Sequence, residues 1–106
     1  MSEGLDRLFA TIASRKDADP GASYTAKLLA AGVEKCAKKF GEEATETVIA
    51  AIQKDKTELA KESADVLYHL AVLWAASGIT PDDVYAVLKS REVMSGLEEK
   101  ASRSKT

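Results

Sequence analysis

Apolar residues recur at intervals of three and four along almost the whole chain, as Leu5, Leu8 and Ile12 do near its start. This spacing is typical of one face of an α-helix, whereas a half-buried β-strand alternates apolar and polar residues. No segment shows convincing alternation, and the chain contains only two prolines that could interrupt helices. The sequence therefore predicts an all-α fold, a helical bundle.

Residues that start or stop helices divide this pattern into five predicted helices. They cover approximately residues 5–16, 23–31, 33–54, 55–78 and 80–94. Gly41 falls inside the third, where glycine costs about 1 kcal/mol relative to alanine, so we expect the backbone to turn or break there, or another group to approach closely. Asp55 followed by Glu58 resembles a capping box that opens the fourth helix. The third and fourth helices should form a central antiparallel hairpin that turns near Lys54.

A chain of 106 residues has room for one domain, 1–106, with a polar tail from about residue 95 that we expect to be flexible or ordered by a partner. A net charge of −2 gives no electrostatic reason to expect a nucleic-acid or membrane partner. No apolar run approaches the roughly 18 residues that cross a bilayer, and the charged N-terminus does not resemble a signal peptide. Cys36 is the only cysteine, which fits a cytoplasmic protein.

Two acidic doublets are the most informative motif: Glu43 with Glu46, and Glu62 with Asp65. Residues three apart share a helix face. At about 100° per residue, each doublet lies on the same shoulder of its helix, about 60° and 120° from that helix's apolar stripe. In a hairpin that turns near Lys54, Glu43 is level with Asp65, and Glu46 with Glu62. All four carboxylates should therefore meet at one depth.

Four carboxylates in one place repel one another. At an effective dielectric of about 20, two unit charges about 6 Å apart repel by about 3 kcal/mol, which a bundle seam would not tolerate without a cation. Oxygen ligands favour Mg²⁺, or Mn²⁺, over zinc, and Mg²⁺ binds phosphate oxygens, so a polyphosphate is the natural substrate. The alternative is a solvated acidic face, where repulsion falls to a few tenths of a kcal/mol per pair.

An E-x-x-E motif in residues 41–46 is followed by K-E-x-x-D in residues 61–65. This pair is similar to the signature of the all-α, MazG-like nucleotide pyrophosphohydrolases. Within that superfamily, residues 23–29, 63–70 and 95–103 most resemble the phosphoribosyl-ATP pyrophosphatase family. Together these stretches extend the resemblance over nearly the whole chain.

The resemblance implies hydrolysis of phosphoribosyl-ATP to phosphoribosyl-AMP and pyrophosphate, the second step of histidine biosynthesis, by metal-activated water. It also implies a homodimer whose helices combine into a larger bundle. It assigns metal ligation, and with it the catalytic role, to Glu43, Glu46, Glu62 and Asp65.

Five basic residues are candidates for binding the substrate: Lys39, Lys61, Arg91, Lys100 and Arg103. Lys39 could reach a phosphate or Glu43. Lys61 could instead pair with Asp65 on the helix surface. The last three would suit the ribose phosphate if the tail folds over a neighbouring subunit, and are otherwise solvated charges.

Two further residues lie near the acidic doublets. Glu42 points away from the apolar stripe and is either exposed or a support for the ligands. His69 follows Asp65 by one helical turn and could hydrogen-bond it, or be a structural residue. Cys36, Phe40 and Trp74 are expected in the core.

Two other functions remain open. A house-cleaning nucleotide pyrophosphatase would share the acidic cage but would not need the Ser-Gly-x-x-Glu-Lys-Ala tail. A non-catalytic helical dimerisation module would use its acids only for structural cations. Turnover of phosphoribosyl-ATP compared with dUTP and dCTP separates the three.

Overall fold

The structure is a computed structural model that describes residues 3–92, and every regular element in that range is an α-helix. The helices are α1 (Glu3–Ser14), α2 (Tyr24–Ala31), α3 (Val33–Ile52), α4 (Lys56–Ser77) and α5 (Pro81–Glu92). The predicted all-α fold is confirmed. Across this described range, none of the helices combines the length and the apolar character that crossing a membrane requires.

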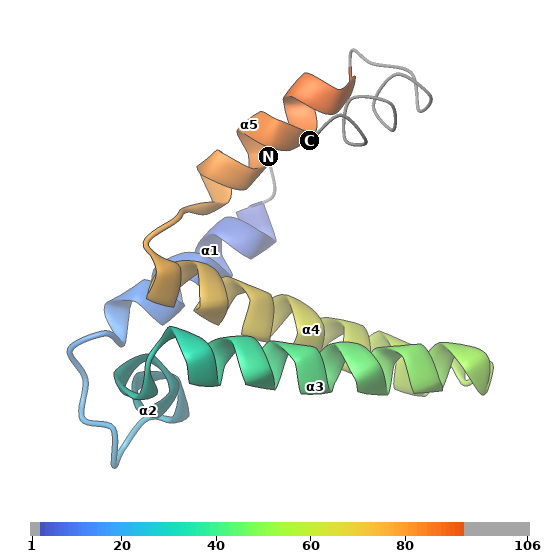
Figure 1. The fold of residues 1–106 in the computed structure, drawn as a ribbon, viewed down its shortest axis with the longest axis horizontal. Coiled ribbons are helices and arrows are strands. Elements are labelled where there is room, and N and C mark those ends of the chain that lie inside the picture. Colours follow the sequence, from blue (N-terminus) through green and yellow to red (C-terminus); the bar gives the residue numbers. More distant parts are fainter. Residues whose placement is uncertain (1–2, 93–106) are drawn as a thin grey trace.

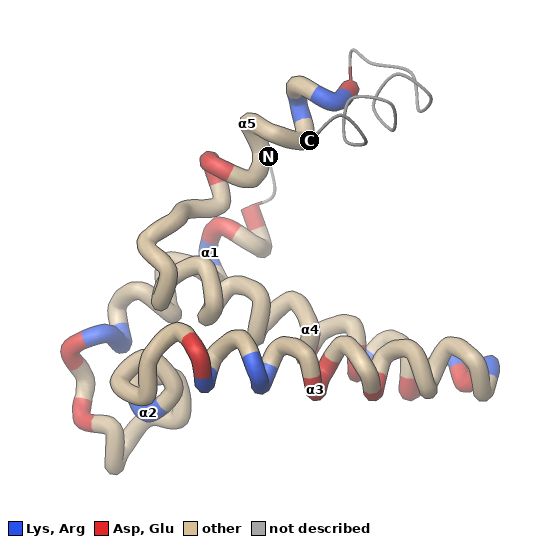
Figure 2. Tube along the Cα trace, viewed as in Figure 1, with Lys and Arg blue, Asp and Glu red and all other residues tan. Residues whose placement is uncertain are grey.

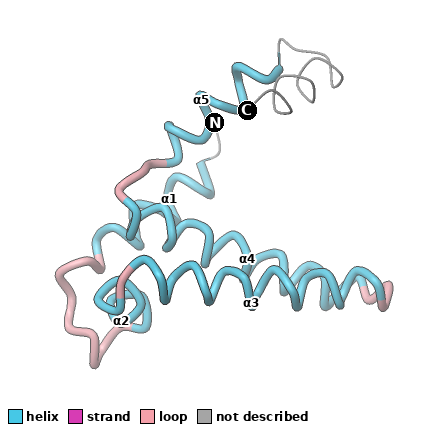
Figure 3. Tube along the Cα trace, in the orientation of Figure 1, coloured by secondary structure: helices cyan, strands magenta, loops and turns pink. Residues whose placement is uncertain are grey.

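The two longest helices, α3 and α4, form the predicted antiparallel hairpin and lie side by side along their length (Figure 1). A short loop joins them at one end of the molecule (Figure 3). Lys54 adopts φ 59° in this loop, and the Asp55 carboxylate accepts a hydrogen bond from the Glu58 amide at 3.0 Å. This cap satisfies an amide at the start of α4 that no intrahelical carbonyl reaches.

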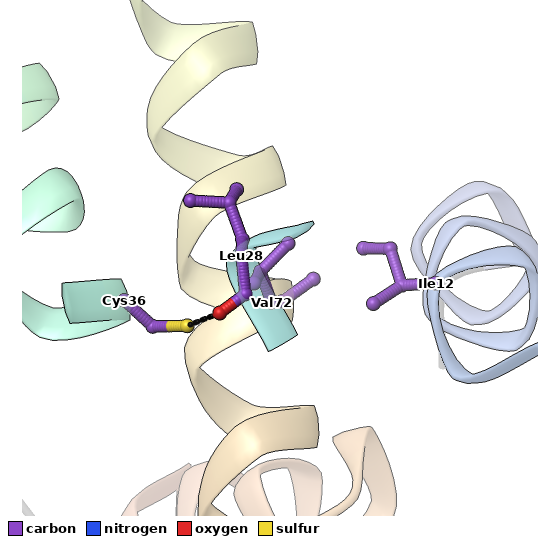
Figure 4. Packing of buried hydrophobic residues seen from close by; sticks show 5 residues of the cluster. Ile12, Leu28, Cys36 and Val72 are labelled. Atoms are coloured by element: carbon purple, nitrogen blue, oxygen red, sulfur yellow. Dashed lines mark hydrogen bonds between the residues drawn. The ribbon is translucent and has the colours of Figure 1, made fainter. Parts of the chain in front are cut away.

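The hydrophobic core lies at the open end of the hairpin, where α1 and α2 pack against it. Its buried residues are Ile12, Leu28, Cys36, Ala71 and Val72 (Figure 4). The Cys36 thiol donates a hydrogen bond to the Leu28 carbonyl at 3.2 Å, which ties α3 to α2. Helix α5 extends away from the hairpin (Figure 1). The Tyr85 hydroxyl of α5 donates a hydrogen bond to the Asp6 carboxylate of α1 at 3.0 Å.

Two of the three predicted core residues are buried. Cys36 is 1% exposed and Trp74 is 8% exposed, whereas Phe40 is only half-buried. The expected disturbance at Gly41 does not occur. Helix α3 runs through it unbroken, and a Cβ atom built there would meet no atom of the described chain within 4 Å.

The face of α3 that packs on α4 differs from the predicted one. The apolar stripe predicted for this helix consists of Val33, Ala37, Phe40, Ala44, Val48 and Ala51. Val33 and Val48 of this stripe are exposed. Cys36 and Ala50 are buried instead, and Glu43 lies on the same face between them. The packed face of α3 is therefore turned from the apolar stripe toward the acidic shoulder.

Candidate metal centre

Carboxylates from both arms of the hairpin converge on one point. Glu43 of α3 and Glu62 and Asp65 of α4 each offer an oxygen atom, and the three oxygens lie within 4.8 Å of one another. The hairpin creates this arrangement because antiparallel helices that turn at Lys54 bring Glu43 level with Asp65. Since Glu43 lies on the packed face of α3, its carboxylate points across the seam.

Glu46 extends the cluster toward the loop of the hairpin. Its carboxylate contacts those of Glu43 and Glu62 closely enough to raise both of their pKa values. Glu46 and Glu62 also line a small pocket of about 170 Å³ together with Gln53 and Glu58. All four residues of the two doublets therefore belong to one acidic cluster.

The cluster makes ionisation of its members unfavourable. Desolvation is the main cause that raises the pKa of Glu62 to about 7, followed by contacts with Glu46, then Glu58 and Asp65. The pKa of Glu43 is raised from its ordinary value by desolvation first, and then by the charges of Glu46 and Asp65. A cation in the cluster would reverse these effects by stabilising the charged forms.

The surroundings of one Glu62 oxygen indicate whether the site suits a metal ion. Oε2 is closed off from solvent and has no hydrogen-bond partner among the described residues. Buried acceptors usually have a partner, and a lone pair left without one is costly. Together with oxygen-only donors from Glu43 and Asp65, this unpartnered atom fits a hard divalent cation. The acidic cluster can hold a metal ion.

Lys39 and Glu42 lie on α3 at the end of the cluster nearer α2. The Lys39 Nζ atom is 3.3 Å from Oε2 of Glu42, which is exposed. The pKa of Lys39 is raised mainly by its hydrogen bond to Glu42, then by Tyr24 and with a smaller contribution from Glu43. Lys39 is thus a fixed positive charge beside the carboxylates.

His69 lies one turn beyond Asp65 and is 6% exposed. Its ring makes edge-to-face contacts with Tyr68, at a centroid distance of 5.0 Å, and with Tyr24, at 6.4 Å. Nδ1 is closed off from solvent without a hydrogen-bond partner in the described chain. Burial, followed by the charge of Lys39, lowers the pKa of His69, so the ring is neutral near pH 7.

Two of the four remaining predicted substrate contacts, Lys61 and Arg91, lie within the described residues. Lys61 is exposed on α4, and Arg91 lies in the last turn of α5, which extends away from the hairpin (Figure 2). Lys100 and Arg103 are outside the described residues. Any contact of Arg91 with the cluster would therefore have to involve another chain.

Sequence reasoning missed two residues near the cluster. Glu58 was predicted only as part of a helix cap, although its position four residues before Glu62 was a usable signal that it shares that face. Tyr24 received no role. Its exposure and its contact with His69 depend on how α2 packs against α4, which no local pattern reveals.

Comparison with known proteins decides the family. The family model for phosphoribosyl-ATP pyrophosphohydrolase matches residues 5–92. The chain belongs to the phosphoribosyl-ATP pyrophosphohydrolase family. The matched range includes the whole hairpin and both acidic doublets.

Relatives from several organisms are similar to this chain over more than nine-tenths of their lengths. A protein named phosphoribosyl-ATP pyrophosphatase from Parvibaculum lavamentivorans is 64% identical over 99 residues, covering 93% of this chain and 91% of the relative. One from Cereibacter sphaeroides is 59% identical over 99 residues, covering 93% and 96%. One from Paramagnetospirillum magneticum is 57% identical over 104 residues, covering 98% and 95%.

Proposed function

We propose that this chain hydrolyses phosphoribosyl-ATP to phosphoribosyl-AMP and pyrophosphate, the second step of histidine biosynthesis. Family membership and the names of the relatives support the substrate. The observation that carries the chemistry is the convergence of one oxygen each from Glu43, Glu62 and Asp65 within 4.8 Å of one another. One oxygen of the same Glu62 carboxylate is buried without a hydrogen-bond partner among the described residues.

The proposed cofactor is Mg²⁺, with Mn²⁺ as a substitute. Oxygen-only ligands exclude the donor types that zinc and copper prefer. Glu43, Glu46, Glu62 and Asp65 would hold the metal. When bound, a divalent ion neutralises charge on phosphate oxygens and makes water more acidic.

The residues of the chain would bind the substrate and accept the proton released in the reaction. Water attacks the α-phosphorus, the bond from that phosphorus to the bridging oxygen breaks, and pyrophosphate leaves with the bond electrons. A carboxylate of the cluster accepts the proton that the water loses. Lys39, which pairs with Glu42, would bind a phosphate oxygen. Substrate contacts from Lys39, Lys61, Arg91, Lys100 and Arg103 all stay predictions.

A homodimer is part of the proposal. Val48, Ile52 and Leu67 are 56%, 74% and 48% exposed on the hairpin. On a helical wheel they lie on the opposite side from the carboxylates. A second copy of the chain packed on these residues would bury apolar surface without covering the acidic cluster. The one cysteine, Cys36, is unpaired and buried, which supports a cytoplasmic setting.

The test is pyrophosphate release from phosphoribosyl-ATP, compared with release from dUTP and dCTP, with Mg²⁺ and again with EDTA. We expect Mg²⁺-dependent turnover of phosphoribosyl-ATP only. Turnover of the deoxynucleotides instead would identify a house-cleaning pyrophosphatase, and no turnover of any nucleotide would favour a non-catalytic dimerisation module. Complementation of a histidine auxotroph that lacks this step, with Glu62→Gln as the control, provides the corresponding test in cells.

A further inference from the structure

Tyr24 is an aromatic residue that the folded chain leaves in solvent. It is 53% exposed at the start of α2, although the ring could have been buried in the nearby core. Its only ring contact in the described chain is the edge-to-face contact with His69, at an interplanar angle of 87°. In this geometry, at least one face of the tyrosine ring is free of His69, whichever ring presents its edge.

The position of Tyr24 is fixed by the residues around it. His69 is held between Tyr24 and Tyr68, and the Tyr68 hydroxyl shares a hydrogen bond with the hydroxyl of Thr25. The Ser23 side chain caps the same turn by accepting a hydrogen bond from the Ala26 amide at 3.1 Å. These contacts attach the first turn of α2 to α4 and hold the exposed Tyr24 ring in position.

That support places Tyr24 at one end of the acidic cluster. His69 is one turn beyond Asp65 on α4, and Lys39 is one turn before Glu43 on α3, so both lie about 6 Å along the hairpin toward α2. Tyr24 contacts His69 and also raises the pKa of Lys39. Carboxylates, a positive charge and an exposed aromatic ring therefore follow one another along the hairpin.

A nucleotide has the matching order of groups, since its polyphosphate is joined through ribose to a flat base. We propose that Tyr24 stacks on the adenine ring of the substrate while the carboxylates and Lys39 bind its phosphates. This inference rests on the proposed function, because it assumes that the cluster binds the polyphosphate. His69 is a positioning residue that orients the tyrosine.

The space beside Tyr24 fits this assignment. An open pocket of about 500 Å³ lies against its ring and is lined by Ser23, Lys27 and the loop before α2. At the other end of the cluster, the small pocket beside Glu62 has a volume of only about 170 Å³ and carries the additional acid Glu58. The larger of the two pockets, which Tyr24 lines, has the volume that a purine with its ribose requires.

Direct binding tests the stacking without requiring turnover. The probes are α,β-methylene-ATP, which keeps the base, and tripolyphosphate, which lacks it, each with Mg²⁺. Since stacking a base on an aromatic residue changes affinity by a factor of roughly 5 to 150, we expect Tyr24→Leu to raise the Kd of α,β-methylene-ATP about tenfold. Its Kd for tripolyphosphate should stay at the wild-type value, and Tyr24→Phe should bind both probes normally.

Two results would overturn the proposal. Equal weakening of both probes would show a structural role for Tyr24, and no weakening of either would show that the base lies elsewhere.

Sedimentation of Tyr24→Leu checks whether the residue belongs to a contact between copies instead. With phosphoribosyl-ATP, the variant should raise KM and leave kcat nearly unchanged. Failure of the wild-type chain to release pyrophosphate would count against the proposed function, whereas the binding result decides the stacking.

Discussion

Single carboxylates determine both the chemistry and the electrostatic cost of the site. Each ligand oxygen is needed to hold the cation, but removing a negative charge from the metal-free cluster relieves repulsion. Glu43→Gln, Glu46→Gln, Glu62→Gln and Asp65→Asn should therefore each lower kcat/KM by at least about a hundredfold, as expected for the loss of a group that acts in catalysis, with helicity retained.

The measurements are steady-state kinetics with Mg²⁺ and far-ultraviolet circular dichroism. Glu34→Gln is the matched control, because Glu34 is an exposed acid in the first turn of the same helix, and it should keep wild-type kinetics. Wild-type activity in any one of the four variants would remove that residue from the metal centre.

The raised pKa of Glu62 makes the stability of the metal-free chain depend on pH. Its pKa is about 7 in the folded state, against an ordinary value of 4.5, so between these values the folded state binds more protons than the unfolded state. The free energy of unfolding should therefore fall as pH rises from about 4.5 to about 7. His69 opposes this trend, since its lowered pKa makes acidification below 6.5 destabilising.

The difference in unfolding free energy between wild type and Glu62→Gln isolates the contribution of the Glu62 carboxylate. Thermal unfolding in EDTA across this range should show the stabilising effect of Glu62→Gln growing as pH rises. Saturating Mg²⁺ should abolish the advantage of the variant. A difference that stays constant with pH would mean that the Glu62 pKa is not raised in the folded chain.

At the scale of elements, Gly41 is the weak point of α3. The helix continues through it, and a Cβ atom there would have no neighbour of the described chain within 4 Å. Gly41→Ala should therefore stabilise the chain by about 1 kcal/mol in urea unfolding, through helix propensity alone. Gly78→Ala is the contrasting control, because Gly78 ends α4 at φ 80° and alanine there should destabilise by about 1 kcal/mol. Destabilisation by Gly41→Ala would reveal a group beyond the described residues packed on that helix.

The hairpin shows which parts of the structure local patterns can predict. Helix ends follow from capping groups such as Asp55 and Gly78, and the level of Glu43 with Asp65 follows from counting residues back from the turn. Such reasoning could therefore place the acidic residues near one another. Local patterns could not identify the packed face of α3. Periodicity shows which positions are apolar, but it does not show which neighbouring helix covers each of them. Val48 belongs to the apolar stripe but is exposed, whereas Ala50 lies outside that stripe and is buried in the seam.

The same limit applies to contacts between distant elements. Tyr24 and His69 are brought together by the packing of α2 on α4, and the hydroxyls of Thr25 and Tyr68 meet for the same reason. None of these pairs has a short-range signature. The sequence therefore predicted the carboxylates of the site but not the aromatic group beside them.

At the scale of the whole molecule, half of the hairpin lacks cover. Helices α1, α2 and α5 gather at its open end, and the half near the loop extends beyond them (Figure 1). Two helices alone cannot enclose the apolar side chains that they carry, so Val48, Ile52 and Leu67 remain in water. Large apolar side chains left in solvent are typical of a surface that another chain covers.

We therefore expect the wild-type chain to sediment as a dimer and Leu67→Asp to sediment as a monomer, because burying an unpaired carboxylate in an apolar interface is unfavourable. Val87→Asp is the matched control. Val87 is 49% exposed and Leu67 48%, but Val87 lies on α5 away from the hairpin. Analytical ultracentrifugation of the three proteins at one concentration measures the outcome. A monomeric wild-type chain, or dissociation by Val87→Asp but not by Leu67→Asp, would show that the exposed side of the hairpin is not the interface.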